Sequence, residues 1–162
     1  MSELLQKLST LSGREYGLLE MLVGAQFLQQ DQLVGWVHQI VDDRLTLAEA
    51  YSEHARACDL QRDTECRRAI SRAYYAAHHA GRAVVYEVRR RDVATHEGVI
   101  AEVDQILGEE AASAVRGLHR LRNQVEYELY LPWLDLRGEA ETALVQASEF
   151  LGRCQAFVAG RR

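Results

Sequence analysis

The stretch from Thr64 to Arg91, TECRRAISRAYYAAHHAGRAVVYEVRRR, decides the fold of this chain. Apolar or small residues recur along it at alternating spacings of three and four, at Ile70, Tyr74, Ala77, Gly81, Val84 and Val88. This spacing matches the period of an α-helix and places all of them on one face. The stretch therefore predicts a long helix with one buried face, which begins with Asp63 or Thr64 as its N-cap.

Other segments carry the same helical period. They run from Arg44 to Leu60, from Gly98 to Leu107, from Glu110 to Leu131 and from Glu139 to Val158. Pro132 is expected to end the third of these, because proline disfavours helical geometry in the residue before it. No segment alternates apolar and polar residues as a strand does. The pattern predicts an all-α protein, an antiparallel bundle of four to five helices joined by short loops.

Residues 1–41 differ from the rest of the chain. They are rich in Leu and Val, include Phe27 and Trp36, and are interrupted by four glycines. We expect an additional N-terminal helical segment here, which packs against the bundle or against a second subunit. The predicted organisation is thus an extension over residues 1–41 followed by a helical bundle over residues 42–159.

The composition limits the classes of function. The chain has 162 residues, of which 48% are apolar and 27% charged, which suits one globular helical domain with an appended piece. Acidic residues outnumber basic ones by 24 to 19, so a protein that coats nucleic acid through its overall charge is excluded. Any contact with nucleic acid must come from a local group of arginines.

The sequence contains no motif for a metal site or a cofactor and no segment that could span a membrane. Cys58, Cys66 and Cys154 are odd in number and match no metal or redox spacing, so we interpret them as reduced and structural. No pair of His and carboxylate residues has the spacing of a bundle metal site, and no glycine-rich phosphate loop occurs. The most apolar segment, 16–28, carries Glu20 and is too short to span a bilayer. We expect a cytoplasmic protein, and we expect it to have no cofactor.

A second stripe adjoins the apolar face of the 64–91 helix and alternates cations with flat rings. Guanidinium groups hold phosphate through paired hydrogen bonds, and Tyr or His rings stack on bases, so this stripe is a candidate RNA or nucleotide surface. The alternative is that these side chains cover the rim of a bundle or fill a subunit contact. The stripe consists of Arg68, Arg72, Tyr75, His79, Arg82 and Tyr86.

The helix expected from Glu110 to Leu131 has a similar border, formed by His119, Arg122, Glu126 and Tyr130. An arginine at such a border is partly desolvated and needs an acceptor. Glu126, one turn further on, is the nearest candidate, and Asn123 can add a hydrogen bond. The group is either a structural ion pair or an arginine held ready for a phosphate.

Three stretches resemble the signature stretches of the HEPN family, in the same order. They are RRAISRAYYAAHHAGRAVVYEV (67–88), THEGVI (95–100) and LRNQVEYE (121–128). The resemblance covers roughly residues 44 to 158 and implies a four- to five-helix bundle that dimerises through its long helices and brings two copies of the third stretch together. It depends on Arg72, Ala73, Tyr74, Tyr75, His79, Thr95, His96, Gly98, Val99, Arg122, Glu126 and Tyr127.

The resemblance also bears on catalysis. Many HEPN proteins are metal-independent ribonucleases in which an Arg is followed, after four to six residues, by a His. Here the Arg is Arg122, but Tyr127 stands at the fifth position beyond it. A phenol with a pKa of about 10 is a poor base near neutral pH, and loss of acid-base catalysis costs about 10²- to 10⁴-fold in rate. His119, one turn before Arg122, could replace the missing group.

A subgroup of the family, with an acidic residue and Tyr after the Arg, is more similar to this chain. Its members are often encoded beside small nucleotidyltransferases in toxin-antitoxin arrangements. We therefore expect a HEPN homodimer that binds RNA, a nucleotide or a nucleotidyltransferase partner, with weak or no nuclease activity. The alternatives are a ribonuclease toxin with Arg122 and His119 as catalytic residues, and a structural adaptor. The expected binding residues are Arg68, Arg72, Tyr75, His79, Arg122, Asn123, Glu126, Tyr127 and Tyr130.

Overall fold

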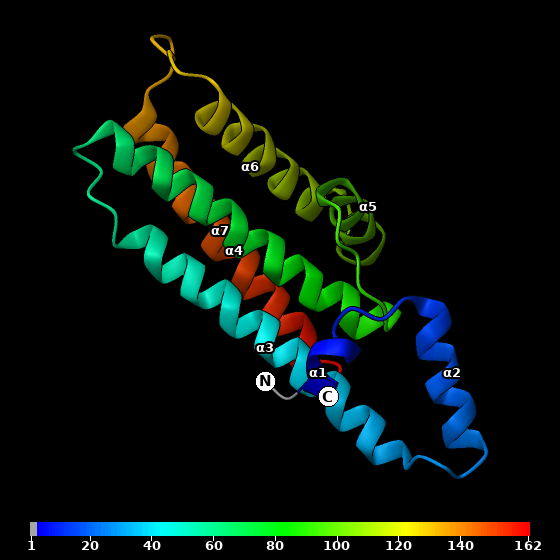
Figure 1. Cartoon of the computed structure of the whole chain (residues 1–162). Coiled ribbons are helices and arrows are strands. Elements are labelled where there is room, and N and C mark those ends of the chain that lie inside the picture. The colour runs from blue at the N-terminus through cyan, green and yellow to red at the C-terminus, as the bar shows by residue number, and fades with distance from the viewer. Residues whose placement is uncertain (1–2) are drawn as a thin grey trace.

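The computed structural model describes residues 3–162, and within that range it contains only α-helices and no strand (Figure 1). The all-α prediction, a helical bundle with an N-terminal helical segment, is confirmed. No helix of the described residues is long and apolar enough to cross a membrane. The helices are α1 (Glu3–Leu8), α2 (Gly13–Gly24), α3 (Gln30–Arg56), α4 (Asp63–Arg89), α5 (His96–Leu107), α6 (Glu109–Tyr127) and α7 (Leu136–Ala159).

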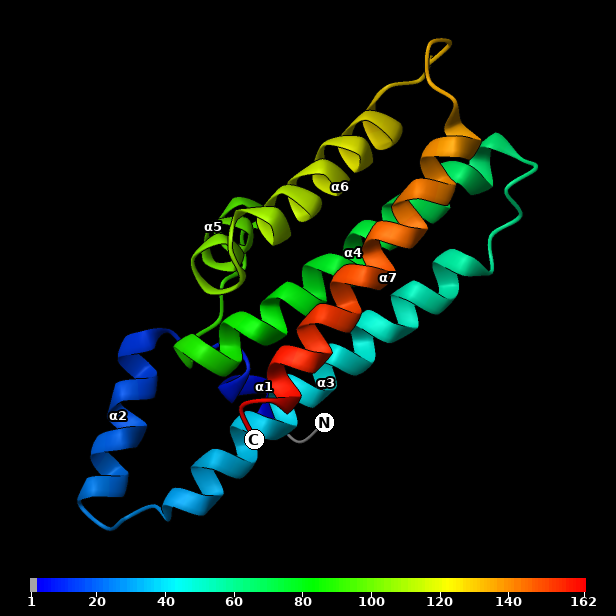
Figure 2. The same ribbon diagram turned by 180° about the vertical axis from the view of Figure 1, so that it is seen from behind.

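Helix α4 is the centre of the bundle. It packs most extensively against α3 and α7 and also contacts α5 and α6 (Figures 1 and 2). Successive long helices run in opposite directions, whereas α4 and α7 run the same way. The side chains of α4 permit this close packing because many are small. Its buried alanines are Ala69, Ala73, Ala76, Ala77, Ala80 and Ala83.

Gly81 lies at a place where α4 packs tightly against α5. A Cβ atom at this position would lie 3.1 Å from Val99 Cγ1 and 3.2 Å from Val103 Cγ2. Such contacts are tighter than packed side chains normally make, so a small residue is needed here. The approach brings the N-terminal turn of α5 beside the middle of α4. Thr95 fixes that turn by accepting a hydrogen bond from the Gly98 N–H at 3.2 Å.

The expected start of a helix at Arg44 is wrong, because this helix is α3 and begins at Gln30. The boundary predicted between residues 41 and 42 therefore falls inside one continuous helix. Leu33, Val37 and Ile40 are buried in the same core as the bundle. The polar run from Asp42 to Arg44 resembles a helix start in the sequence, but the helix continues through it.

The C-terminus of α6 also differs from the prediction. The helix ends at Tyr127, before the expected Leu131, so Pro132 does not terminate it. Arg67 of α4 binds the end of the helix instead. Its Nη1 donates to the carbonyls of Val125 at 2.6 Å and Glu128 at 2.8 Å, and its Nη2 donates to Leu129 at 3.2 Å. These bonds satisfy carbonyls that the last turn of a helix leaves free.

Two helix starts are corrected as well. Helix α4 begins at Asp63, after Arg62, and no side chain caps it, so neither Asp63 nor Thr64 is the N-cap. The acidic residues of its first turn still interact favourably with the helix dipole. Helix α7 begins at Leu136, where Asp135 accepts a hydrogen bond from the Gly138 N–H at 3.1 Å.

The N-terminal segment is tied to the end of α4. Buried Tyr86 donates its hydroxyl hydrogen to the Leu8 carbonyl at 2.6 Å, and the Asp92 N–H donates to the Leu11 carbonyl at 2.9 Å. Helix α1 packs on α3, whereas α2 lies beside the bundle with few contacts (Figure 1). Helix α1 and its link to α2 are therefore the part of the segment that the bundle holds.

Changing Tyr86→Phe should lower the free energy of unfolding by about 1 kcal/mol, because one buried hydrogen bond is lost while the ring remains. Urea denaturation measures this loss, and hydrogen exchange should become faster around Leu11. Tyr130→Phe is the matched control, since Tyr130 is 78% exposed. Equal stability of the two variants would contradict the proposed tie.

Candidate functional site

Helices α4, α5 and α6 bring aromatic and basic side chains together in one place, which we call the α6 cluster. Helix α4 contributes residues at spacings that keep them on the side facing α5 and α6. Helix α5 contributes a residue of its first turn, and α6 contributes residues of its last two turns. The α6 cluster consists of Tyr74, Tyr75, His78, His96, His119, Arg122, Asn123, Glu126 and Tyr127.

Arg122 is the permanent cation of the cluster. It donates to the Tyr75 hydroxyl at 3.0 Å and to Asn123 Oδ1 at 3.0 Å, and it forms an ion pair with Glu126. These contacts confirm the predicted partners Glu126 and Asn123. The guanidinium carbon lies 5.6 Å from the centre of the Tyr75 ring and 5.5 Å from that of Tyr127, within the range of cation–π attraction.

The charge of Arg122 is stable, but its hydrogen-bonding capacity is not used up. Burial opposes the charge, yet the attraction of Glu126 and Tyr75 outweighs this effect and raises the pKa of Arg122. Its side chain is only 12% exposed, and its Nε is buried with no acceptor among the described residues. One N–H of the guanidinium therefore lacks the partner that a buried donor requires.

Asn123 connects Arg122 to His119. Because Asn123 Oδ1 accepts from Arg122, its Nδ2 faces His119 Nε2, at 3.3 Å. An amide nitrogen only donates, so Nε2 is the acceptor and the ring proton of the neutral imidazole lies on Nδ1. Burial, together with the nearby His96, lowers the pKa of His119. His119 is therefore uncharged near neutral pH.

Tyr74 joins the imidazoles of two other helices. Its buried ring stacks on His119 with centroids 5.2 Å apart, and its hydroxyl lies 2.5 Å from His96 Nδ1. Burial raises the pKa of Tyr74, so the phenol keeps its proton and is able to donate it to that nitrogen. The His96 and His119 rings are 5.1 Å apart, one on α5 and the other on α6.

His78 closes the cluster on its inner side. Its ring centre lies 4.7 Å from that of His96, and its Nδ1 is buried without a partner among the described residues. Burial, reinforced by the neighbouring His96 and His79, lowers the pKa of His78 to about 3. No group of His, Cys, Asp and Glu in residues 3–162 has the arrangement of a metal site. The cluster thus combines an arginine–glutamate ion pair with tyrosine and imidazole rings.

The structure brings together most of the residues expected on α6. Arg122, Asn123, Glu126 and Tyr127 share the cluster with His119 and with Tyr75 of α4. Tyr130 does not join them. It lies in the loop after α6 and is 78% exposed.

The stripe predicted along α4 is divided among separate neighbours. Arg68 forms an exposed ion pair with Glu65 at 2.9 Å, and Arg72 donates to the His54 carbonyl of α3 at 3.2 Å, so neither reaches the cluster. Tyr86 is buried and bonds to the N-terminal segment instead.

His79 adjoins the cluster through His78, whose ring centre lies 5.6 Å away, and also through Tyr51 of α3. Its ring stacks on Tyr51 with centroids 5.4 Å apart, and the Tyr51 and Tyr75 rings are 5.6 Å apart. These three rings form a row along the contact between α3 and α4. Arg82 lies beyond the row and pairs with Asp92.

Tyr74, His78 and His96 also belong to the site, although the sequence pattern did not predict them as members. Tyr74 was assigned to the apolar face, and His96 entered only as part of a signature stretch. A signal was present, because Tyr74 and His78 are one turn apart on a face expected to be buried. Polar groups on such a face need partners, which predicts a further polar residue on a neighbouring helix.

No protein-family model matches the chain, and no curated protein matches it.

The low pKa of His78 predicts a stability that depends on pH. Unfolding restores the ordinary pKa of 6.5 from about 3, so the unfolded chain binds more protons in this range. The contribution of His78 is complete above pH 6.5 and is lost as the pH falls toward 3, by about 1.4 kcal/mol for each pH unit.

Urea denaturation over this range should show the loss, and His78→Leu should make the dependence shallower by one proton. In NMR spectra, the His78 ring signal should stay constant over roughly pH 5 to 8, where an unperturbed imidazole titrates. A His78 signal that titrates with a midpoint near 6.5 would disprove the buried, neutral state.

Proposed function

We propose that this chain is a HEPN-type helical bundle that binds RNA or a nucleotide at the α6 cluster, with weak or no nuclease activity. In this proposal it acts in the cytoplasm as a homodimer, in an arrangement of the toxin-antitoxin type that includes a nucleotidyltransferase partner. The resemblance of residues 67–88, 95–100 and 121–128 to the family supports the partner and the system. The chemistry of the cluster supports RNA or a nucleotide as the ligand.

The observation that carries the proposal is the setting of Arg122. Its guanidinium lies against two tyrosine rings and keeps one buried N–H without an acceptor. A phosphate oxygen supplies such an acceptor through a charge-assisted hydrogen bond. The exposed ring of Tyr127 offers a face on which a base can stack.

The charges of the chain set the strength of binding. The net charge is −5, so no long-range attraction draws RNA to the protein. Glu126 also occupies Arg122 and competes with a phosphate for it. The negative charge of Glu126 therefore opposes the approach of a phosphate, which keeps the affinity moderate.

The same geometry argues against strong cleavage. Attack of a ribose 2′-hydroxyl on the adjacent phosphate needs a base that takes a proton and an acid that supplies one. His119 is uncharged, so it lacks the extra proton that an acid would supply. The lone pair of its Nε2, which a base would use, already accepts a hydrogen bond from Asn123. Tyr127, at the position of the family's histidine, is a phenol and a poor base at neutral pH.

An active ribonuclease is the second candidate, and one observation favours it. His96 and His119 lie 5.1 Å apart on different helices, close to Arg122. Two imidazoles beside an arginine contain the groups for a base, an acid and a phosphate anchor. In this alternative His96 takes the role that Tyr127 cannot fill.

Binding of labelled single-stranded RNA in EDTA tests the proposal. Arg122→Ala should weaken binding by about tenfold or more, because hydrogen bonds to charged groups contribute about 1.5–3 kcal/mol. Arg120→Ala is the matched control, since exposed Arg120 lies on the same helix outside the cluster. Glu126→Gln should tighten binding, because it removes the competing carboxylate.

The same samples distinguish the two candidates. RNA that stays intact while binding depends on Arg122 supports a binding protein. Robust cleavage that disappears in Arg122→Ala, His119→Ala and His96→Ala establishes the ribonuclease instead. Equal affinities of Arg122→Ala and Arg120→Ala would remove Arg122 from the ligand site.

A homodimer is the other testable part. The loop after α6 exposes Leu129 and Tyr130 at 78% each and Trp133 at 70%, an apolar surface of the kind that subunit contacts cover. Light scattering at micromolar concentration should give twice the monomer mass of 18.4 kDa, and Leu129→Glu with Trp133→Glu should return it to the monomer value. A monomer mass for the unchanged protein would contradict the dimer.

A further inference from the structure

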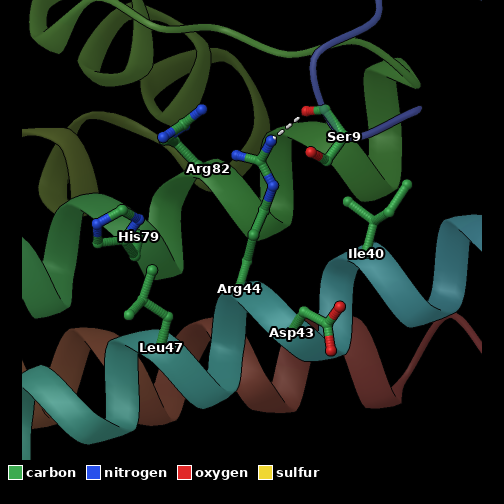
Figure 3. Close-up of a pocket in the computed structure, with 7 residues that line it drawn as sticks. All are labelled: Ser9, Ile40, Asp43, Arg44, Leu47, His79 and Arg82. Atoms are coloured by element: carbon green, nitrogen blue, oxygen red, sulfur yellow. Dashed lines mark hydrogen bonds between the residues drawn. The ribbon is translucent and has the colours of Figure 1, made fainter. Parts of the chain in front are cut away.

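A pair of arginines lies away from the α6 cluster, at the far end of the row of rings. Arg44 of α3 and Arg82 of α4 line an open pocket of about 180 Å³ (Figure 3). The pocket is bordered by Ser9 of the N-terminal segment and by His79 of α4. It therefore lies where three separate parts of the chain meet.

The two arginines share a single carboxylate. Asp92 accepts from Arg44 Nη2 at 2.9 Å, and it accepts from Arg82 Nε at 3.2 Å and from Arg82 Nη2 at 2.7 Å. One negative charge therefore faces two positive ones. The second terminal nitrogen of Arg82, Nη1, is not used by Asp92.

Arg44 is short of acceptors as well as of counter-charge. Its side chain is 10% exposed, and its Nε and Nη1 are buried without an acceptor among the described residues. Nη2 donates to the Ser9 carbonyl at 2.7 Å (dashed line in Figure 3). The other terminal nitrogen points to the side of Arg82 and His79. Burial, with the nearby charge of Arg82, lowers the pKa of Arg44, so the surroundings destabilise its charged form.

The rest of the pocket suits an anion with a ring attached. Burial and the two arginines lower the pKa of His79 to about 4, which leaves a neutral imidazole stacked on Tyr51. Asp43, also at the pocket, accepts a hydrogen bond from Gln39 at 2.9 Å, and Figure 3 shows its carboxylate directed away from the Arg44 guanidinium. Asp43 weakens the positive field but does not pair with either arginine.

We propose that this pocket binds a phosphoryl group, held between Arg44 Nη1 and Arg82 Nη1. A phosphate has several acceptor oxygens, so it can satisfy both arginines and supply the missing negative charge in one step. The group comes either from inorganic phosphate or from a nucleotide whose base packs on the ring of His79, which Tyr51 supports from behind. This site does not depend on RNA binding at Arg122.

Isothermal titration of the full chain with sodium phosphate tests the proposal, with sodium chloride and sodium acetate at equal ionic strength as controls. One saturable site for phosphate, and none for the controls, is expected. Arg82→Gln should weaken binding by about tenfold or more, since it removes a charged donor while the Arg44 pair with Asp92 remains. The matched control is Arg116→Gln, an arginine paired with Glu109 on the other side of the bundle.

Variants that bind phosphate more tightly must be folded, so they exclude misfolding as the cause of a change in binding. Asp43→Asn should tighten phosphate binding severalfold, because it removes a negative charge from the pocket. In Asp92→Asn the two arginines lose their shared carboxylate, so added phosphate should raise the melting temperature of this variant more than that of the wild type. Wild-type protein without a saturable site for phosphate or AMP, or an Arg82→Gln variant that binds as well as Arg116→Gln, would overturn the proposal.

Titration with AMP identifies the source of the phosphoryl group. Tighter binding of AMP than of phosphate, which His79→Leu returns to the phosphate value, assigns the pocket to a nucleotide. Equal binding of both ligands, unchanged in His79→Leu, assigns it to inorganic phosphate.

Discussion

The architecture depends on one constraint, that α4 is contacted along its length by other helices, so its polar side chains must find partners on them. Arg67 binds the end of α6, Tyr74 meets His96 of α5, and Tyr86 reaches the N-terminal segment. Each bond satisfies a group that would be costly to bury alone. The same bonds fix where α6 ends and how the neighbouring segments approach α4.

Two arginines have buried N–H groups for which the neighbouring helices provide no acceptor, and both proposed binding sites include such an arginine. Arg122 and Arg44 each keep a buried N–H without an acceptor. Both lie next to α4, and the rings of Tyr75, Tyr51 and His79 connect them. Flat rings thus lie between the two cationic positions, and bases can stack on such rings in the binding that we propose.

Sequence periodicity was sufficient for the helices and for contacts within one helix. The Arg122 contacts with Asn123 and Glu126 join residues one and four positions apart, and a helical projection predicts them. The contacts between Tyr74 and His96 and between Arg44 and Asp92 join different elements across long separations. Periodicity shows which face is buried but not which helix covers it, so these pairs were missed.

Helix ends show the same limit. The sequence signals at Pro132 and at the polar run before Arg44 are local, whereas α6 ends where Arg67 reaches its carbonyls. Likewise α3 begins at Gln30 because its first turns bury apolar residues in the common core. Tertiary contacts outweigh the local preference at both positions.

The burial that packs the bundle also selects its chemistry. Desolvation lowers the pKa of His78, His79 and His119, so these imidazoles are uncharged near neutral pH. A catalyst of phosphodiester cleavage needs a group whose protonation changes near the working pH, whereas an arginine keeps its charge throughout. The positive charge at both sites therefore resides on guanidinium groups that hold phosphates well and transfer protons poorly. A phosphate-binding protein is the function that this division of roles suits best.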